Sequence, residues 1–229
     1  MTTIQRHTLL AVGACVAASV GVRADMVTYA GKVYETVDWV TVDDAGETAT
    51  GTAAGVGVTF DTPDIAESTI FSADYSTDPS YDALSFVSGT SESLHVKAGA
   101  VGTSTLTFDT GVSEVLILIG LPGDEDFSRE WGAALWDFAD AQPVSIVDSE
   151  AAAGFTLGAG NVISNSTDAT DHESGAILVG GLGTTLSWDQ SSSSGRDSMN
   201  FTIAVLVPAP GGALVLAGAL IPACRRRRR

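Results

Sequence analysis

Residues 114–120 form the stretch Glu-Val-Leu-Ile-Leu-Ile-Gly. Its apolar side chains occupy consecutive positions, which predicts a strand that is buried on both faces. Elsewhere, shorter runs alternate apolar and polar residues, the pattern of a strand with one face in a core and one in water. We therefore place residues 114–120 at the centre of a sheet. The alternating runs are residues 32–42, 55–60, 93–97, 104–108, 176–180, 184–188 and 199–207.

Turn-forming residues separate these runs. Asp, Gly, Pro and Ser bend a chain at low cost, and they recur about every ten residues between the predicted strands. Short strands at this spacing are typical of an antiparallel β-sandwich or jelly roll, so we expect an all-β domain. The turns fall at residues 43–46, 61–64, 78–80, 109–111 and 191–195.

One segment carries a helical pattern instead. Ser128 is placed to cap a helix, and four apolar side chains after it fall near one helical face, although Gly132 weakens the pattern. A single helix within the β-domain is therefore expected here. The four side chains are Trp131, Leu135, Trp136 and Phe138.

Charge is distributed very unevenly along the 229 residues. The chain has 28 Asp and Glu against 11 Lys and Arg, for a formal charge of −17. Residues 25–207 hold all 28 acids and only four of the basic residues, so this stretch carries −24. Such a charge repels phosphate backbones, and we expect no binding to nucleic acid.

The first 24 residues have the layout of a secretory signal peptide. A weakly basic start precedes an apolar run over residues 9–22, and Val22-Arg23-Ala24 supplies the small residues that signal peptidase requires. We predict cleavage between Ala24 and Asp25. Two alternatives are a buried N-terminal helix and a lipoprotein cleavage box ending at Cys15.

The last 22 residues form a second three-part signal. Pro208, Ala209 and Pro210 come first, an apolar stretch over 211–224 follows, and five arginines close the chain. As a helix, the apolar stretch would span roughly 21 Å, which is short for a hydrocarbon core of about 30 Å. The arginines would stay in the cytoplasm and place the acidic domain outside. They are Arg225, Arg226, Arg227, Arg228 and Arg229.

This order of Pro-x-Pro, short apolar helix and terminal arginines resembles the PEP-CTERM sorting signal of bacterial exported proteins. Ala209 stands where that family usually has Glu. The resemblance covers these last 22 residues and implies processing near Pro210 by an exosortase-like membrane protease. It also implies an inner-membrane-tethered precursor that ends at the cell surface or in an exopolysaccharide matrix. The implied domains are a signal peptide (1–24), an acidic ectodomain (25–207) and a sorting tail (208–229).

An acidic loop is the best candidate for a metal site. Asp124, Asp126 and Ser128 offer oxygens at alternate positions, and calcium binds six to eight such hard ligands. Arg129 and Leu135 occupy the positions where a complete EF-hand needs Gly and Glu. The loop is therefore either a calcium site completed by other segments or a solvated acidic turn.

Residues suited to catalysis are scarce. Residues 25–207 contain no cysteine and only two histidines, His95 and His172, and the chain has no Gly-x-Ser-x-Gly elbow or phosphate-binding loop. We expect both histidines to be structural or solvated. A glycosidase needs only two carboxylates, so 28 acids leave that activity open.

Tryptophans are candidates for stacking on sugars. Trp39 and Trp188 alternate with polar neighbours in predicted strands and are expected in the core. Trp131 and Trp136 are the candidates for a glycan-stacking surface. The sequence as a whole predicts a non-enzymatic, exported structural or interaction protein. A carbohydrate-binding module of the exopolysaccharide matrix and a glycan hydrolase are the alternatives.

Overall fold

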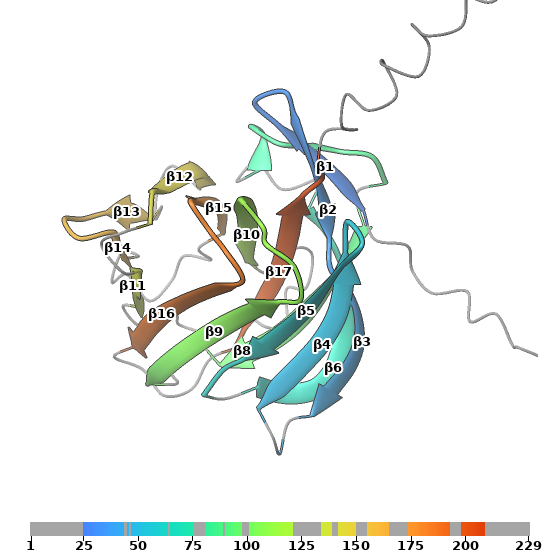
Figure 1. The fold of residues 1–229 in the computed structure, drawn as a ribbon. Coiled ribbons are helices and arrows are strands. Elements are labelled where there is room, and N and C mark those ends of the chain that lie inside the picture. The colour runs from blue at the N-terminus through green and yellow to red at the C-terminus, as the bar shows by residue number, and fades with distance from the viewer. Residues whose placement is uncertain are drawn as a thin grey trace, which may run out of the picture.

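The structure, a computed structural model, consists of two antiparallel sheets (Figure 1). The described residues contain no α-helix, which confirms the all-β prediction, and the two sheets share one core in a sandwich-like arrangement. The predicted signal helix and tail helix fall outside these residues, and within them no helix has the length and apolarity to cross a membrane. The structure describes residues 25–43, 45, 47–63, 65–75, 81–88, 90–97, 101–120, 134–138, 142–149, 155–164, 174–192 and 198–208.

Sheet A has nine strands, and β10 (Glu114–Gly120) lies inside it as predicted. Strand β10 pairs with β15 on one side and with β17 on the other, and every residue after Glu114 is buried. The strand order is β12-β15-β10-β17-β2-β1-β7, with β8 paired to β17 and β6 to β8. The remaining strands are β1 (Met26–Tyr29), β2 (Lys32–Thr36), β6 (Ile65–Asp74), β7 (Ser85–Phe86), β8 (Thr90–Lys97), β12 (Val144–Ser149), β15 (Gly175–Gly180) and β17 (Ser198–Leu206).

Sheet B has eight strands in the order β13-β14-β11-β16-β9-β5-β4-β3. Its middle strands curve around the core and present their other face outward (Figure 1). The strands are β3 (Asp38–Asp43), β4 (Thr48–Ala53), β5 (Val56–Asp61), β9 (Gly102–Phe108), β11 (Ala134–Phe138), β13 (Thr156–Leu157), β14 (Val162–Ser164) and β16 (Thr185–Ser192).

The predicted strand over residues 32–42 is two strands in different sheets. Strand β2 belongs to sheet A and β3 to sheet B, and the chain crosses between them at Val37. Val37 is fully buried, and its N–H donates to the Ile203 carbonyl at 2.8 Å. The crossing places Asp38 and Trp39 where the two sheets meet.

The helix expected after Ser128 is wrong for residues 134–138, which form strand β11. This strand pairs with β14 and β16, and its side chains alternate between exposed and buried. Trp136 and Phe138 point into the core, while Leu135 and Asp137 face outward. Cross-strand pairing thus overrides the helical spacing. Ser128 and Trp131 lie outside the described residues.

The main core fills the space between the sheets. Phe60, Trp188 and Phe201 stack there with ring centroids 5.0 to 5.9 Å apart. Trp39 and Trp188 are each 3% exposed, as predicted. Burying a large apolar side chain contributes roughly 1.5–3 kcal/mol to the stability of the folded state. These aromatic side chains therefore stabilise the core strongly.

A second core covers the outer face of sheet A. Tyr34, Tyr75, Tyr81 and Leu84 pack there against Leu116 and Leu118 of β10. The Tyr81 hydroxyl donates to the Ile119 carbonyl at 2.6 Å, and the Tyr75 hydroxyl bonds Ser93 and Thr202. This second core explains why β10 is apolar on both faces.

Candidate functional site

The outer face of sheet B carries two ordered rows of polar side chains. Residues that alternate with core residues along β3, β4, β5, β9 and β16 point away from the core, and cross-strand register aligns them. All of them are exposed or half-buried. We call the first set the threonine row: Thr41, Thr50, Thr59, Thr107 and Thr185. The second set, the mixed row, is Asp43, Thr48, Asp61, Thr105 and Ser187.

The mixed row alternates carboxylates with hydroxyls at its β3 end. Asp43 on β3 is opposite Thr48 on β4, which is opposite Asp61 on β5. Because neighbouring strands lie about 4.8 Å apart, the two aspartates are separated by about 9.6 Å. Carboxylates thus recur at every second strand in this part of the sheet.

Hydrogen bonds between strands hold several of these side chains in place. Thr41 Oγ1 lies 2.5 Å from Thr50 Oγ1, and Thr48 Oγ1 donates to Asp61 Oδ1 at 2.8 Å. Thr105 Oγ1 lies 3.0 Å from Ser187 Oγ. A ligand would therefore meet side chains that have already lost much of their rotamer freedom.

A shallow pocket of about 230 Å³ lies beside the mixed row. Asp137 of β11 and Asp189 of β16 face each other directly across the strands there. Thr103 Oγ1 donates to Asp189 Oδ1 at 2.5 Å. Like charges directly opposite each other destabilise a sheet, so this pair favours a ligand that supplies positive charge or hydrogen-bond donors. Ser187 and Trp188 complete the lining.

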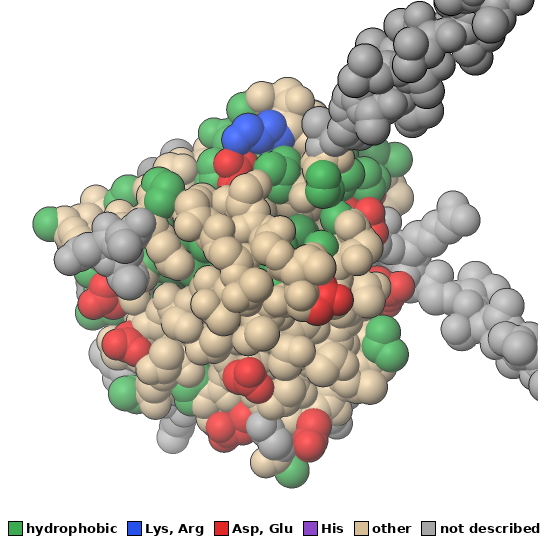
Figure 2. All heavy atoms as spheres, viewed as in Figure 1, with side chains coloured by type: hydrophobic (Ala, Val, Ile, Leu, Met, Phe, Trp, Pro, Cys, Tyr) green, Lys and Arg blue, Asp and Glu red, His purple; other side chains and the backbone are tan. Residues whose placement is uncertain are grey.

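The charged residues in the strands of this face are all negative. The strands of sheet B contain no Lys, Arg or His. Figure 2 shows this side of the molecule as a broad polar expanse with scattered carboxylates, while the blue that marks Lys or Arg appears at its upper end. The face is therefore suited to hydroxyl-bearing or cationic ligands.

A second carboxylate pair lies where the sheets meet. Glu92 of β8 accepts the main-chain N–H of Trp39 at 2.6 Å, and its carboxylate lies beside that of Asp38. The pKa of Glu92 is raised to about 7, chiefly by burial; the Trp39 N–H opposes this rise, and the charge and hydrogen bond of Asp38 add to it. This pair joins β3 of sheet B to β8 of sheet A, which indicates a structural role.

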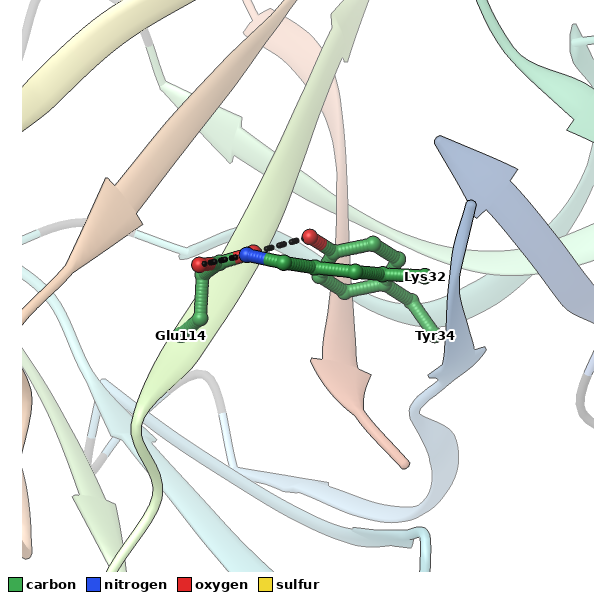
Figure 3. Close-up of polar contacts among 3 residues, drawn as sticks. All are labelled: Lys32, Tyr34 and Glu114. Carbon is green, nitrogen blue, oxygen red and sulfur yellow. Dashed lines mark hydrogen bonds and ion pairs between the residues drawn. The ribbon is translucent and has the colours of Figure 1, made fainter. Parts of the chain in front are cut away.

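A third cluster of polar side chains, formed by Lys32, Tyr34 and Glu114, links β2 to β10 across β17. Lys32 Nζ lies 2.7 Å from Glu114 Oε2, and the buried Tyr34 hydroxyl donates to Glu114 Oε1 (Figure 3). Burial, followed by the Glu114 hydrogen bond and charge, holds the pKa of Tyr34 well above its usual value. The three side chains satisfy one another, and this arrangement indicates that they stabilise the sheet.

The structure places Trp136, a predicted glycan-stacking residue, in the core, and it describes few of the other predicted site residues. Trp136 is 3% exposed and packs in the core, so the prediction of surface stacking is wrong for it. Asp25 is buried beside β2, Pro208 is exposed after β17, and His95 is buried on β8. Outside the described residues lie Ala24, Asp124, Asp126, Ser128, Trp131, His172, Ala209, Pro210 and Arg225 to Arg229. Within the described ranges, no three His, Cys, Asp or Glu side chains gather to hold a metal ion.

Sequence reasoning missed the two polar rows. Residues 48–52 and 103–107 each repeat Thr at alternate positions, which indicates polar strand faces. The rows form only when β3, β4, β5, β9 and β16 pair in register, and that register joins residues far apart in the chain. No protein-family model, curated protein or solved structure matches the chain.

Proposed function

We propose that this chain is an exported, non-enzymatic protein of the cell surface or extracellular matrix, and that it acts by binding. The observation that carries the proposal is the polar face of sheet B, which spreads ordered hydroxyls and carboxylates over five strands. Enzymes for small molecules commonly use a concave, largely apolar pocket. A broad polar face is better suited to contact with an extended partner.

The sorting part of the proposal rests on the two ends of the chain. Signal peptidase would remove residues 1–24, and an exosortase-like protease would act on the tail 208–229. The described fold is compatible with both steps, because β1 begins at Met26 and β17 ends at Leu206. Both cleavages would leave every strand of the two sheets intact.

The C-terminus of the extracellular protein tests this route. We expect mass spectrometry of surface or matrix material to find a chain that ends near Pro210. Replacing Arg225 to Arg229 with Ser removes the charge that stops transfer, and we expect mis-sorting. A matched variant with five Lys at these positions keeps the charge and should remain tethered. Mature extracellular protein that retains Arg229 would show a lasting membrane anchor instead of processing.

A second candidate function is a carbohydrate-binding module of the exopolysaccharide matrix. The ordered rows of Thr, Ser and Asp favour it, since hydroxyls and carboxylates are the groups that bind sugar hydroxyls. Retention of one sugar class on a glycan array would support this function. Equal retention of all classes would argue for a general structural role.

A further inference from the structure

We propose that the outer face of sheet B binds an extended chain of β-1,4-linked amino sugars with free ammonium groups, laid across the strands along the mixed row. This inference deepens the proposed binding function and rests on it. It names the ligand class and the residues that would hold the ligand. Three features of the face lead to this ligand: its spacing, its charge and its curvature.

The spacing of the carboxylates matches such a chain. Asp43 and Asp61 lie two strands apart, which is about 9.6 Å. In an extended β-1,4-linked chain, neighbouring sugars are turned over, so the same edge recurs at every second sugar. Two sugars advance by a length close to two strand spacings. Asp43 would therefore contact the amino group of one sugar, and Asp61 would contact the amino group of the sugar two positions along the chain.

Charge selects among the glycans with this geometry. A polyuronate would be repelled by the carboxylates of the mixed row. A neutral glycan offers Asp43 and Asp61 only uncharged hydroxyl donors, whose hydrogen bonds to carboxylates are weaker than those of an ammonium group. An ammonium group forms charge-assisted hydrogen bonds with carboxylates, while the sugar hydroxyls can bond Thr48, Thr105 and Ser187.

The pocket provides a stronger position at one end of the row. Asp137 and Asp189 oppose each other there, and an ammonium group between them would relieve their repulsion. Asp189 lies two residues beyond Ser187 on β16, about 6.8 Å further along the strand. A chain that crosses the sheet slightly diagonally would reach this pocket.

The curvature of the sheet favours a flexible chain over a rigid surface. Adjacent strands are rotated by roughly 20–25°, and the rows cross five strands. Figure 1 shows the corresponding curl of β16, β9, β5, β4 and β3. A flat crystalline ligand could touch only part of such a face, whereas a single glycan chain can follow it.

Calorimetric titration of the full chain in a neutral detergent tests the inference. The probes are a fully deacetylated glucosamine hexasaccharide, its N-acetylated counterpart and a polyuronate of equal length, all at about pH 5.5, above the usual pKa range of carboxyl groups. We expect the deacetylated oligomer to bind at least about tenfold more tightly than the acetylated one, and no binding of the polyuronate. Equal binding of the two glucosamine oligomers would overturn the inference without any variant.

Paired variants separate the site from general attraction. Asp43→Asn with Asp61→Asn, and Asp137→Asn with Asp189→Asn, should each weaken binding by about tenfold or more. Asp74→Asn with Asp82→Asn removes the same charge near the outer face of sheet A and should leave binding almost unchanged. An equal loss in all three pairs would show unspecific attraction and overturn the site. A chain that reaches the matrix but binds no oligomer contradicts this inference alone, while one that binds but is never exported contradicts the proposed function.

Discussion

Asp25 and Thr36 are joined by two hydrogen bonds, one donated by the main-chain N–H of each residue. The Asp25 N–H donates to Thr36 Oγ1 at 2.8 Å, and the Thr36 N–H donates to the Asp25 carbonyl at 2.9 Å. Asp25 is 2% exposed, and its carboxylate accepts the N–H groups of Met26 and Ser88. The predicted signal cleavage therefore falls beside a residue that the folded domain buries.

Signal peptidase should consequently act before β1 pairs with β2. We expect the purified, folded full chain to be cut at least about tenfold more slowly than a peptide of residues 15–32, because the folded chain must first open locally. Mass spectrometry of the products measures both rates and should show the new terminus at Asp25. Equal rates would mean that the contacts of Asp25 open freely or that cleavage occurs elsewhere.

The strands themselves were accessible to sequence reasoning, because burial of one face imposes alternation. The run at 114–120 was correctly placed inside a sheet, and Trp39 and Trp188 were correctly placed in the core. The sequence does not show which strands pair with each other. The apolar core positions shift phase between Tyr34 and Val37, but a phase shift alone does not reveal that the chain crosses from sheet A to sheet B.

The same limit explains what was missed at the candidate site. Leu135 to Phe138 fit both an alternating strand and one face of a helix, and only pairing with β14 and β16 decides between them. Asp43 and Asp61 fall in predicted turn segments, where their alignment across β4 cannot be read. Long-range register therefore determines the site, while local pattern determines the strands.

Gly120 has no room for a side chain. A Cβ atom there would lie 2.5 Å from the Tyr81 hydroxyl and 2.6 Å from Ser174 Cβ. We expect Gly120→Ala to destabilise the protein by about 1–3 kcal/mol, as overpacking of a core does. Urea denaturation measures the loss. Gly111→Ala is the control, because a Cβ at Gly111 meets no atom within 4 Å, and a loss as large as that of Gly120→Ala would contradict this account.

Glu114 should matter more than its ion-pair partner. Glu114→Ala removes the acceptor of the buried Tyr34 hydroxyl, and we expect a cost of about 1–3 kcal/mol. Lys32→Met breaks only a partly exposed ion pair and should cost less than about 1 kcal/mol. Urea denaturation of both variants compares them. Equal losses would show that the charge pair, and not the tyrosine hydrogen bond, dominates this group.

Calcium is the metal to test for the acidic loop. If Asp124, Asp126 and Ser128 bind calcium, calcium at 100 times its dissociation constant would add about 2.7 kcal/mol to the free energy of unfolding. The melting temperature would rise accordingly. Magnesium at equal ionic strength should raise the melting temperature much less, because magnesium requires a near-ideal octahedral arrangement of its ligands. Asp124→Ala with Asp126→Ala should abolish the difference between the ions. A calcium shift that survives this double variant would place the ion elsewhere.

Glu92 should make the stability of the domain depend on pH. Its pKa rises from 4.5 to about 7 on folding, chiefly through burial, so the folded state holds a proton that the unfolded chain has released. The resulting stability is fully present below about pH 4.5 and is lost as the pH rises through about 7. Because Glu92 is half-buried and water screens it in part, we expect a loss on the order of 1 kcal/mol.

Glu92→Gln isolates this effect. The amide oxygen can still accept the Trp39 N–H, but the side chain no longer ionises beside Asp38. We expect urea denaturation between about pH 5 and pH 8 to show a smaller fall in stability for this variant than for the wild type. Asp82→Asn removes one exposed charge elsewhere and should keep the wild-type slope. If Glu92→Gln also keeps that slope, another group carries the pH dependence, and the junction between β3 and β8 does not hold a proton near neutrality.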